Sequence, residues 1–202
     1  MKVYSYVVAR DYGFAPNPFY GACTLATCKP NIRKSAQVGD WVVGTGSKRY
    51  GLNGKLVYAM KVTEILTYDQ YWNDPRFYQK RPNLRGSLKQ AYGDNIYHRN
   101  PKTGRWVQVD SHHSRAGGSP NQANICRDTK SQNVLVGTEF AYWGGDGPRI
   151  PGRFRRGGGL DICCTLQGHK CIFPEEFVKE FITWIQSLGE RGFIRRPRMF
   201  GP

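Results

Sequence analysis

Runs of apolar residues mark the strands that we expect along this chain. Residues 3–10, 41–44 and 56–66 are rich in valine, tyrosine and other β-branched or aromatic residues, a composition that favours strands. Shorter runs of the same kind occupy residues 23–28, 95–98, 105–109, 134–137 and 140–143. Because glycine and proline separate these runs, the pattern predicts a fold with much β structure and many turns.

One long helix is expected near the C-terminal end, over residues 175–188. Pro174 precedes two glutamates that complement the helix dipole, and Gly189 follows the last apolar position. The apolar residues between them recur at helical spacing: Phe177, Phe181, Trp184, Ile185 and Leu188. This spacing predicts a helix packed on the core. A second, shorter helical turn is expected after Thr67, because Thr67 and Gln70 form a capping-box pattern.

The middle of the chain has a different character. Residues 73–133 are polar, basic and rich in glycine, which predicts long loops of the kind that often carry function. The chain contains no internal repeat and no linker, so we expect one domain over residues 1–202. The predicted fold class is α+β: a small mixed β-barrel with long basic loops and a core-packed C-terminal helix.

The charge of the chain bears on its partners. The 30 lysines and arginines against 15 acidic residues give a formal net charge of +15, which attracts polyanions. Basic and aromatic residues alternate in residues 72–81 and 153–156, a mixture that suits phosphate contact and base stacking. DNA is therefore the first expected partner, with RNA or a free nucleotide as alternatives. The competing interpretation is a solvated basic surface.

The start of the chain and its cysteines bear on location. Met1 leads directly into an alternating strand pattern without a signal-peptide core, and no apolar run is long enough to cross a membrane. The six cysteines then indicate reduced thiols. We expect a cytoplasmic protein with no membrane partner.

Several sequence strings resemble known families. Residues 38–44 and 57–65 resemble the paired strands of PUA-like domains such as the ASCH and EVE groups. Longer strings are similar to the nucleotide modification associated domain of the second type over nearly the whole chain: residues 4–6, 11–19, 28–33, 93–97 and 140–144. This resemblance implies a PUA-like barrel in a bacterial or phage system that modifies DNA or defends against modified DNA. Partner proteins of that system are implied as well.

PUA-like relatives imply a pocket that receives one base, with aromatic walls and polar groups that contact the base edge. The candidate walls are Tyr12, Phe14, Trp41 and Trp72. The candidate polar groups are Asp11, Asn17, Asp94 and Asn95, because carboxylates and amides can bond a base edge. The structural alternative is that the aromatics fill the core and that the polar residues form turns.

Phosphate contacts are expected in basic, glycine-rich segments. The candidates are Ser47, Lys48, Arg49, Arg76, Lys80, Arg81, Arg153, Arg155 and Arg156. The segment 44–49 lacks the spacing of a nucleotide-hydrolase phosphate loop, so we expect contact with a phosphate rather than hydrolysis. A solvated basic loop is again the alternative.

Three residues are candidates for acid–base chemistry: Asp11, Asp94 and His113. A zinc site built on Cys23 and Cys28 with a second cluster (Cys163, Cys164, His169 and Cys171) is disfavoured by irregular spacing. A catalytic cysteine is also disfavoured, because no neighbouring sequence identifies its base. We expect no metal and no cofactor.

Three functions therefore remain open. The first is a module that binds nucleic acid or a modified nucleotide without chemistry of its own. The second is an enzyme of base modification or base removal. The third is a non-catalytic subunit of a modification complex.

Overall fold

A computed structural model describes residues 1–156, 159–164 and 168–201. It has a mixed α+β fold, and its contacts group the chain into two compact units. The first unit contains residues 1–11, 36–63 and 137–202, and the second contains residues 12–35 and 64–136. The single domain over residues 1–202 stays a prediction.

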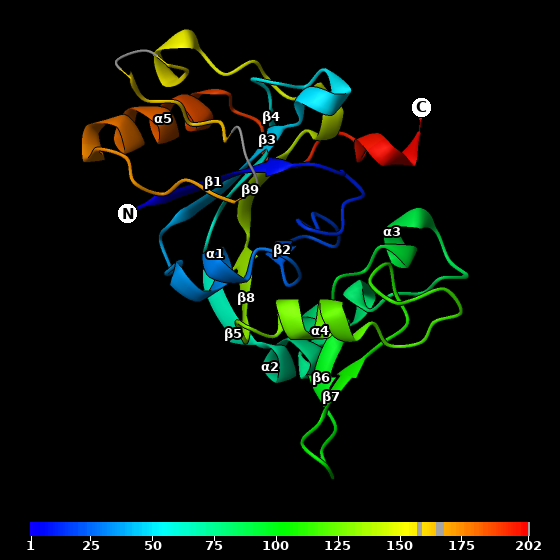
Figure 1. Cartoon of the computed structure of the whole chain (residues 1–202). Helices are drawn as coiled ribbons and strands as arrows, with labels where there is room; N and C mark the ends of the chain where they lie inside the picture. Colours follow the sequence, from blue (N-terminus) through cyan, green and yellow to red (C-terminus); the bar gives the residue numbers. More distant parts are fainter. Residues whose placement is uncertain (157–158, 165–167, 202) are drawn as a thin grey trace. The chain divides into compact units, whose positions relative to one another are not determined.

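A five-stranded sheet forms the centre of the first unit (Figure 1). Its strands, in spatial order, are β1 (Val3–Val8), β3 (Trp41–Gly46), β4 (Leu56–Lys61), β9 (Glu139–Tyr142) and β10 (Gly192–Phe193). The pairs β1–β3 and β9–β10 are parallel, whereas β3–β4 and β4–β9 are antiparallel. The apolar runs that predicted β1, β3, β4 and β9 are confirmed as strands.

Helix α5 (Glu175–Ser187) packs on this sheet. Its buried side chains are Val178, Phe181, Ile182 and Ile185, which share one core cluster with Val3, Val43 and Ala59 of the sheet. The predicted core-packed helix is therefore confirmed. Short 3₁₀ helices complete the unit: η1 (Lys48–Tyr50), η3 (Gly144–Asp146), η4 (Gly152–Phe154) and η6 (Arg198–Phe200).

The second unit contains two smaller sheets. One has the order β2 (Cys23–Leu25), β8 (Asn133–Gly137) and β5 (Glu64–Thr67), and the other pairs β6 (Tyr97–Arg99) with β7 (Trp106–Gln108). Its helices are α1 (Pro30–Ser35), α2 (Tyr68–Asn73), η2 (Pro75–Lys80), α3 (Leu88–Ala91) and α4 (Gln122–Asp128). The capping box of Thr67 and Gln70 is confirmed at the start of α2.

Three expectations about the fold need correction. Residues 56–66 form two strands rather than one, because Val62 leaves the ladder and bonds the backbone of Gly39 and Asp40. Residues 73–133 contain short helices and strands, and their buried Phe77, Ile96 and Ile125 pack into the core of the second unit. The described strands lie in open sheets without a closed barrel, and the PUA-like barrel is not confirmed. No described helix has the length and apolar character needed to cross a membrane.

Candidate functional site

The second unit brings a cysteine, a histidine and an aspartate into one line. The Nε2 atom of His113 lies 3.7 Å from Sγ of Cys28, and its Nδ1 atom lies 2.9 Å from Oδ2 of Asp128. Asp128 is completely buried, His113 is nearly so, and Cys28 is half-buried. A thiol, an imidazole and a carboxylate in this order form the arrangement that activates a nucleophile in cysteine enzymes.

Local backbone geometry presents the thiol. Cys28 stands between β2 and α1 with a φ of 57°, a left-handed conformation that non-glycine residues seldom adopt. Its N–H donates to Oδ1 of Asp128 at 3.0 Å, and its carbonyl accepts from Nε of Arg33 at 2.9 Å. Such strained residues persist where their surroundings fix them, and they concentrate at functional sites.

Buried Arg33 joins the segments that carry the site. Its guanidinium donates to four carbonyl oxygens: those of Cys28, Asp128, Ser131 and Asn133. The donor–acceptor distances run from 2.5 to 2.9 Å. Since Asp128 is the last residue of α4, this clamp holds the end of α4 against the Cys28 segment.

Asp128 orients the imidazole. Its Oδ2 accepts from Tyr97 Oη at 3.0 Å as well as from His113 Nδ1, and its Oδ1 accepts from Arg127 Nε at 3.1 Å. The carbonyl of His113 in turn accepts from Nδ2 of Asn124 at 2.7 Å. With Nδ1 donating to the carboxylate, Nε2 of His113 is directed at the thiol.

These contacts set the charge of the histidine. Burial acts to lower the pKa of His113, but hydrogen bonds to Asp128 and Cys28 outweigh it and raise the pKa to about 9. Burial also acts to raise the pKa of Asp128, and the hydrogen bond from His113 outweighs it, so the pKa of this carboxyl is lowered. The raised pKa favours the protonated imidazole of His113 at neutral pH, a form that can donate a proton.

We expect the charge on His113 to contribute to stability in a defined pH window. Because its folded pKa of about 9 lies above its ordinary value of 6.5, the contribution is complete below about pH 6.5 and is lost as the pH rises through 9. It amounts to about 3 kcal/mol in the free energy of unfolding. Urea unfolding of wild type and His113→Gln between pH 6 and 10 measures it as the difference between the two proteins.

Subtracting the unfolding free energies of the two proteins removes an opposing contribution from Lys80. Burial lowers the pKa of Lys80 to about 8, below its ordinary value, so the Lys80 contribution makes stability rise with pH above 8. This contribution is common to both proteins and cancels. A wild-type advantage that stays constant from pH 6 to 10 would contradict the expected titration of His113.

Aromatic rings gather beside the histidine. The ring of Phe14 lies 4.6 Å from that of His113, and Tyr12 stacks on Tyr92 at 4.9 Å. The exposed ring of His112 contacts Tyr12 at 4.8 Å and Tyr92 at 5.1 Å. Two of the predicted pocket walls, Tyr12 and Phe14, thus lie in one ring cluster with the histidines.

Other predicted pocket residues are buried in a network of their own. Lys80 donates to the carbonyls of Asn17 and Ala22 and to Oδ1 of Asn17, at 2.7 to 3.0 Å. Asp94 accepts from Thr24 and Tyr71, each at 2.7 Å. Asn17, Lys80, Asp94 and Asn95 have no exposed surface. This burial gives them a structural role and leaves neither a base nor a phosphate access to them.

The remaining pocket candidates lie elsewhere. Asp11 belongs to the first unit, where its carboxylate accepts from the Tyr142 hydroxyl and the Arg198 amide. Trp41 lies in the core of that unit. Trp72, in the second unit, stacks on His98 at 4.3 Å, and the guanidinium of Arg81 covers its ring at 3.8 Å.

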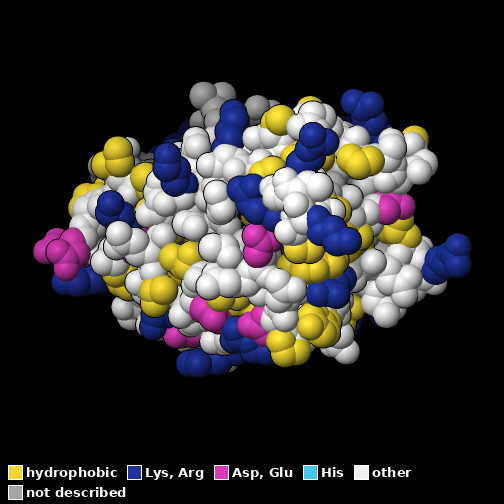
Figure 2. Space-filling model, turned by 90° about the horizontal axis from the view of Figure 1, so that it is seen from below, with side chains coloured by type: hydrophobic (Ala, Val, Ile, Leu, Met, Phe, Trp, Pro, Cys, Tyr) yellow, Lys and Arg dark blue, Asp and Glu magenta, His cyan; other side chains and the backbone are white. Residues whose placement is uncertain are grey.

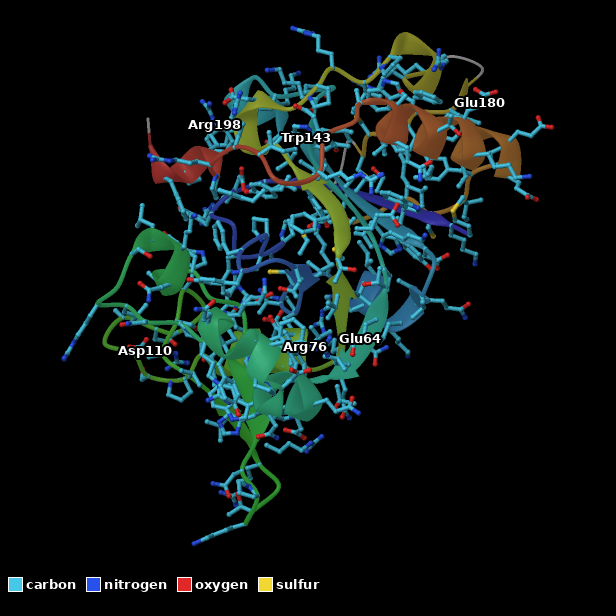
Figure 3. All side chains as sticks on the ribbon, turned by 180° about the vertical axis from the view of Figure 1, so that it is seen from behind. Glu64, Arg76, Asp110, Trp143, Glu180 and Arg198 are labelled. Atoms are coloured by element: carbon cyan, nitrogen blue, oxygen red, sulfur yellow. The ribbon has the colours of Figure 1, made fainter. Side chains whose placement is uncertain are left out.

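Several predicted phosphate ligands are engaged in other contacts. Arg76 pairs with Glu64 and Asp74 (Figure 3). Arg155 and Arg156 both pair with Asp161, and Arg153 covers the Phe154 ring. Lys48 and Arg49 are exposed, and Ser47 caps η1. Residues 157–158 of the predicted basic loop lie outside the described residues. On the face in Figure 2, basic side chains are scattered rather than gathered in one band.

The cysteines do not form a metal cluster in the described part of the chain. All six are free thiols, and no described group of three histidine, cysteine or acidic residues is placed to hold a metal ion. Cys23 is fully buried, and burial raises the pKa of its thiol. Among the candidates for acid–base chemistry, His113 alone lies next to a thiol in this site.

Sequence reasoning named Cys28 in a disfavoured zinc site, disfavoured a catalytic cysteine, and missed Asp128. The cysteine lies 85 positions from His113, and the aspartate lies 15 positions beyond the histidine. No local motif links residues at such separations. The available signals were weak: a Cys-Lys-Pro turn before a short helix, and an aspartate at the end of a helix.

Comparison with known proteins gives one match. A family model described as nucleotide modification associated domain 2 covers residues 1–201. Neither the curated proteins nor the solved structures that we searched gave a match.

Proposed function

Because the chain belongs to the nucleotide modification associated domain 2 family, we propose that it is a thiol-dependent enzyme acting on a modified nucleobase or nucleotide. The observation that carries this proposal is the line of Cys28, His113 and Asp128. The sequence alone favoured a binding module over an enzyme. The geometry around the thiol supports the enzyme instead, with Cys28 in place of Asp11 and Asp94.

Acyl transfer is the reaction class that this set of residues suits best. The Cys28 thiolate attacks the carbonyl carbon of an acyl group on an exocyclic amine of the base, and the carbon–nitrogen bond breaks. His113 gives its proton to the leaving amine, which leaves an acyl thioester on Cys28. A water molecule then attacks the thioester, His113 takes a proton from the water, and the carboxylic acid and the thiolate are released. Buried Asp128 holds the imidazole in place throughout.

The ring cluster supports a nucleobase as the group presented to the thiol. Tyr12, Tyr92 and His112 are partly or fully exposed, and Phe14 packs on His113. Flat rings of this kind stack on bases without regard to sequence. A module that only binds a modified base in this place is the second candidate function, because stacking does not require the thiol.

The setting of this function is also a proposal. We infer DNA, or nucleotides destined for DNA, as the substrate, in a bacterial or phage modification or defence system with further partner proteins. A cytoplasmic location and a PUA-like origin of the fold fit this setting. The positive charge of the chain supports a polyanionic partner.

Thiol labelling tests the proposal without knowledge of the substrate. At pH 6 an ordinary cysteine is mostly protonated and reacts slowly. We expect iodoacetamide to label Cys28 at least about 10-fold faster than the exposed Cys126, because Nε2 of His113 lies 3.7 Å from its sulfur, an arrangement that activates cysteine nucleophiles. Peptide mapping by mass spectrometry after timed labelling gives both rates from one sample.

His113→Gln is the matched variant for this experiment. It keeps a polar side chain near the thiol but removes the charge, so the rate advantage of Cys28 over Cys126 should disappear. Circular dichroism checks that the variant is folded. Equal or slower labelling of Cys28 in the wild type would reject the activated thiol and leave the binding function as the better proposal.

A further inference from the structure

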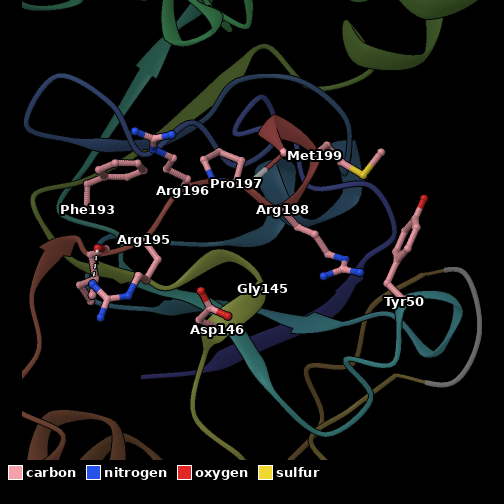
Figure 4. A pocket seen from close by; sticks show the side chains of 11 residues that line it. Tyr50, Gly145, Asp146, Phe193, Arg195, Arg196, Pro197, Arg198 and Met199 are labelled. Carbon is pink, nitrogen blue, oxygen red and sulfur yellow. Dashed lines mark hydrogen bonds between the residues drawn. The ribbon is translucent and has the colours of Figure 1, made fainter.

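The first unit carries an open cleft with a basic lining. Its volume is about 960 Å³, and its walls include Tyr50, Asp146, Phe193 and residues 194–199 (Figure 4). Binding sites for small molecules span about 300–1,000 Å³, so this cleft has room for a ligand larger than one base. Its lining contains no residue of the Cys28 site and none of the predicted pocket, phosphate or acid–base residues.

Three arginines give the cleft its charge. Arg195, Arg196 and Arg198 line it, and Asp146 is the acidic residue of the lining. In the portion of the chain that is described, none of the three guanidiniums forms an ion pair. Guanidinium groups bind phosphate through paired hydrogen bonds, so three of them without acidic partners form a receptor for a polyanion.

The backbone of this segment is held in place before any ligand binds. The amides of Arg198 and Met199 donate to the side chain and the carbonyl of Asp11, each at 3.0 Å. Gly144 has a φ of 58°, and a Cβ there would lie 2.2 Å from the carbonyl oxygen of Arg196. The arginine segment therefore packs tightly on the corner after β9. Such pre-organisation lowers the entropic cost of binding.

Aromatic rings stand beside the arginines. The guanidinium of Arg198 lies 5.7 Å from the centre of the Tyr50 ring, and Figure 4 shows it reaching toward that ring. Phe193 is part of the lining and stacks on Tyr142 at 5.8 Å. A basic groove with rings along it is the usual receptor for single-stranded nucleic acid, because phosphates contact the cations while bases stack on the rings.

We propose that this cleft binds single-stranded nucleic acid, with Arg195, Arg196 and Arg198 on successive phosphates and Tyr50 under a base. The proposal goes beyond the thiol function and does not rest on Cys28. It names a second site in a different unit of the chain, and its ligand is a strand rather than a single nucleotide.

Fluorescence anisotropy with a labelled thymidine 12-mer tests the site. The test variant is the triple change of Arg195, Arg196 and Arg198 to glutamine. The matched control changes three other exposed arginines, Arg85, Arg105 and Arg115, to glutamine, so that both variants lose the same charge. We expect the cleft variant to bind about 10-fold or more weakly near 0.1 M salt, and the control about 3-fold or less. The slope of log affinity against log salt should fall by about 2 in the cleft variant.

Two further measurements complete the test. Tyr50→Leu should weaken binding several-fold with the salt slope unchanged, because it removes stacking and no charge. An equal loss in the cleft and control variants, or no binding by the wild type, would overturn the proposal. Displacement of the 12-mer by thymidine triphosphate at equal nucleotide concentration would also overturn it in favour of a mononucleotide site. None of these outcomes depends on whether Cys28 is reactive.

Discussion

Cys28→Ser is expected to lose turnover by at least about 10³-fold. The serine hydroxyl fills nearly the same space, but an imidazolium at 3.7 Å cannot hold it as an oxyanion in the way it can pair with a thiolate. The assay follows loss of the acyl group from N4-acylcytosine and N6-acyladenine nucleotides, free and in DNA, by liquid chromatography and mass spectrometry. The same measurement identifies the base that is formed.

Cys126→Ser is the control for this prediction, because Cys126 is an exposed free thiol of the same unit. It should keep wild-type turnover. Turnover by Cys28→Ser within about 10-fold of wild type would rule out Cys28 as the nucleophile. If the wild type converts none of these substrates while Cys28 still shows enhanced labelling, the thiol is activated for a different electrophile and the acyl class is wrong.

Arg33→Met is expected to cost the largest amount of folding free energy, about 3–5 kcal/mol. The methionine fills similar space, but it removes the Arg33 donor from the carbonyl oxygens of Cys28, Ser131 and Asn133, and leaves that of Asp128 with Tyr68 Oη at 3.3 Å. Each unsatisfied buried polar group costs about 1–3 kcal/mol, partly offset by relaxation. Urea unfolding at pH 7 measures the loss.

Arg127→Met tests whether the burial of Arg33 accounts for this cost. Arg127 donates to the side chain of Asp128, whose carbonyl Arg33 binds, at 3.1 Å. The side chain of Arg127 is 46% exposed. Its replacement should cost about 1 kcal/mol or less. Similar losses for the two variants would mean that the clamp at Arg33 does not hold the segment together. Arg33→Met should also slow the labelling of Cys28, because Arg33 binds the carbonyl of that residue.

The parts of the fold that could be predicted have local signals. Helix α5 and the capping box at Thr67 follow from residues within one or two turns of each other. The break between β4 and β5 could not be predicted, because Val62 leaves the strand to bond Gly39 and Asp40. Closure of a barrel likewise depends on which strands pair, and apolar alternation carries no information about pairing partners.

The site, like the sheets, depends on contacts between residues that are far apart in the sequence. His113 was a candidate because an imidazole can take up and release a proton near neutral pH, whereas its partners are distant in sequence. Asp94 and Asn17 were chosen because carboxylates and amides can bond a base edge. In the structure Asn17 supplies oxygen partners for buried Lys80, and Asp94 accepts from Thr24 and Tyr71. A sequence pattern cannot distinguish a polar residue that serves the interior from one that serves a ligand.

The carboxylate of Asp128 has a consequence for the order in which the site assembles. One oxygen of this group fixes the Cys28 backbone, and the other fixes His113. Packing of α4 therefore supplies, in one carboxylate, a partner for the turn that bears the thiol and a partner for the imidazole. Before α4 docks, neither the Cys28 turn nor the His113 ring has the carboxylate that holds it, so the proposed function requires the finished fold.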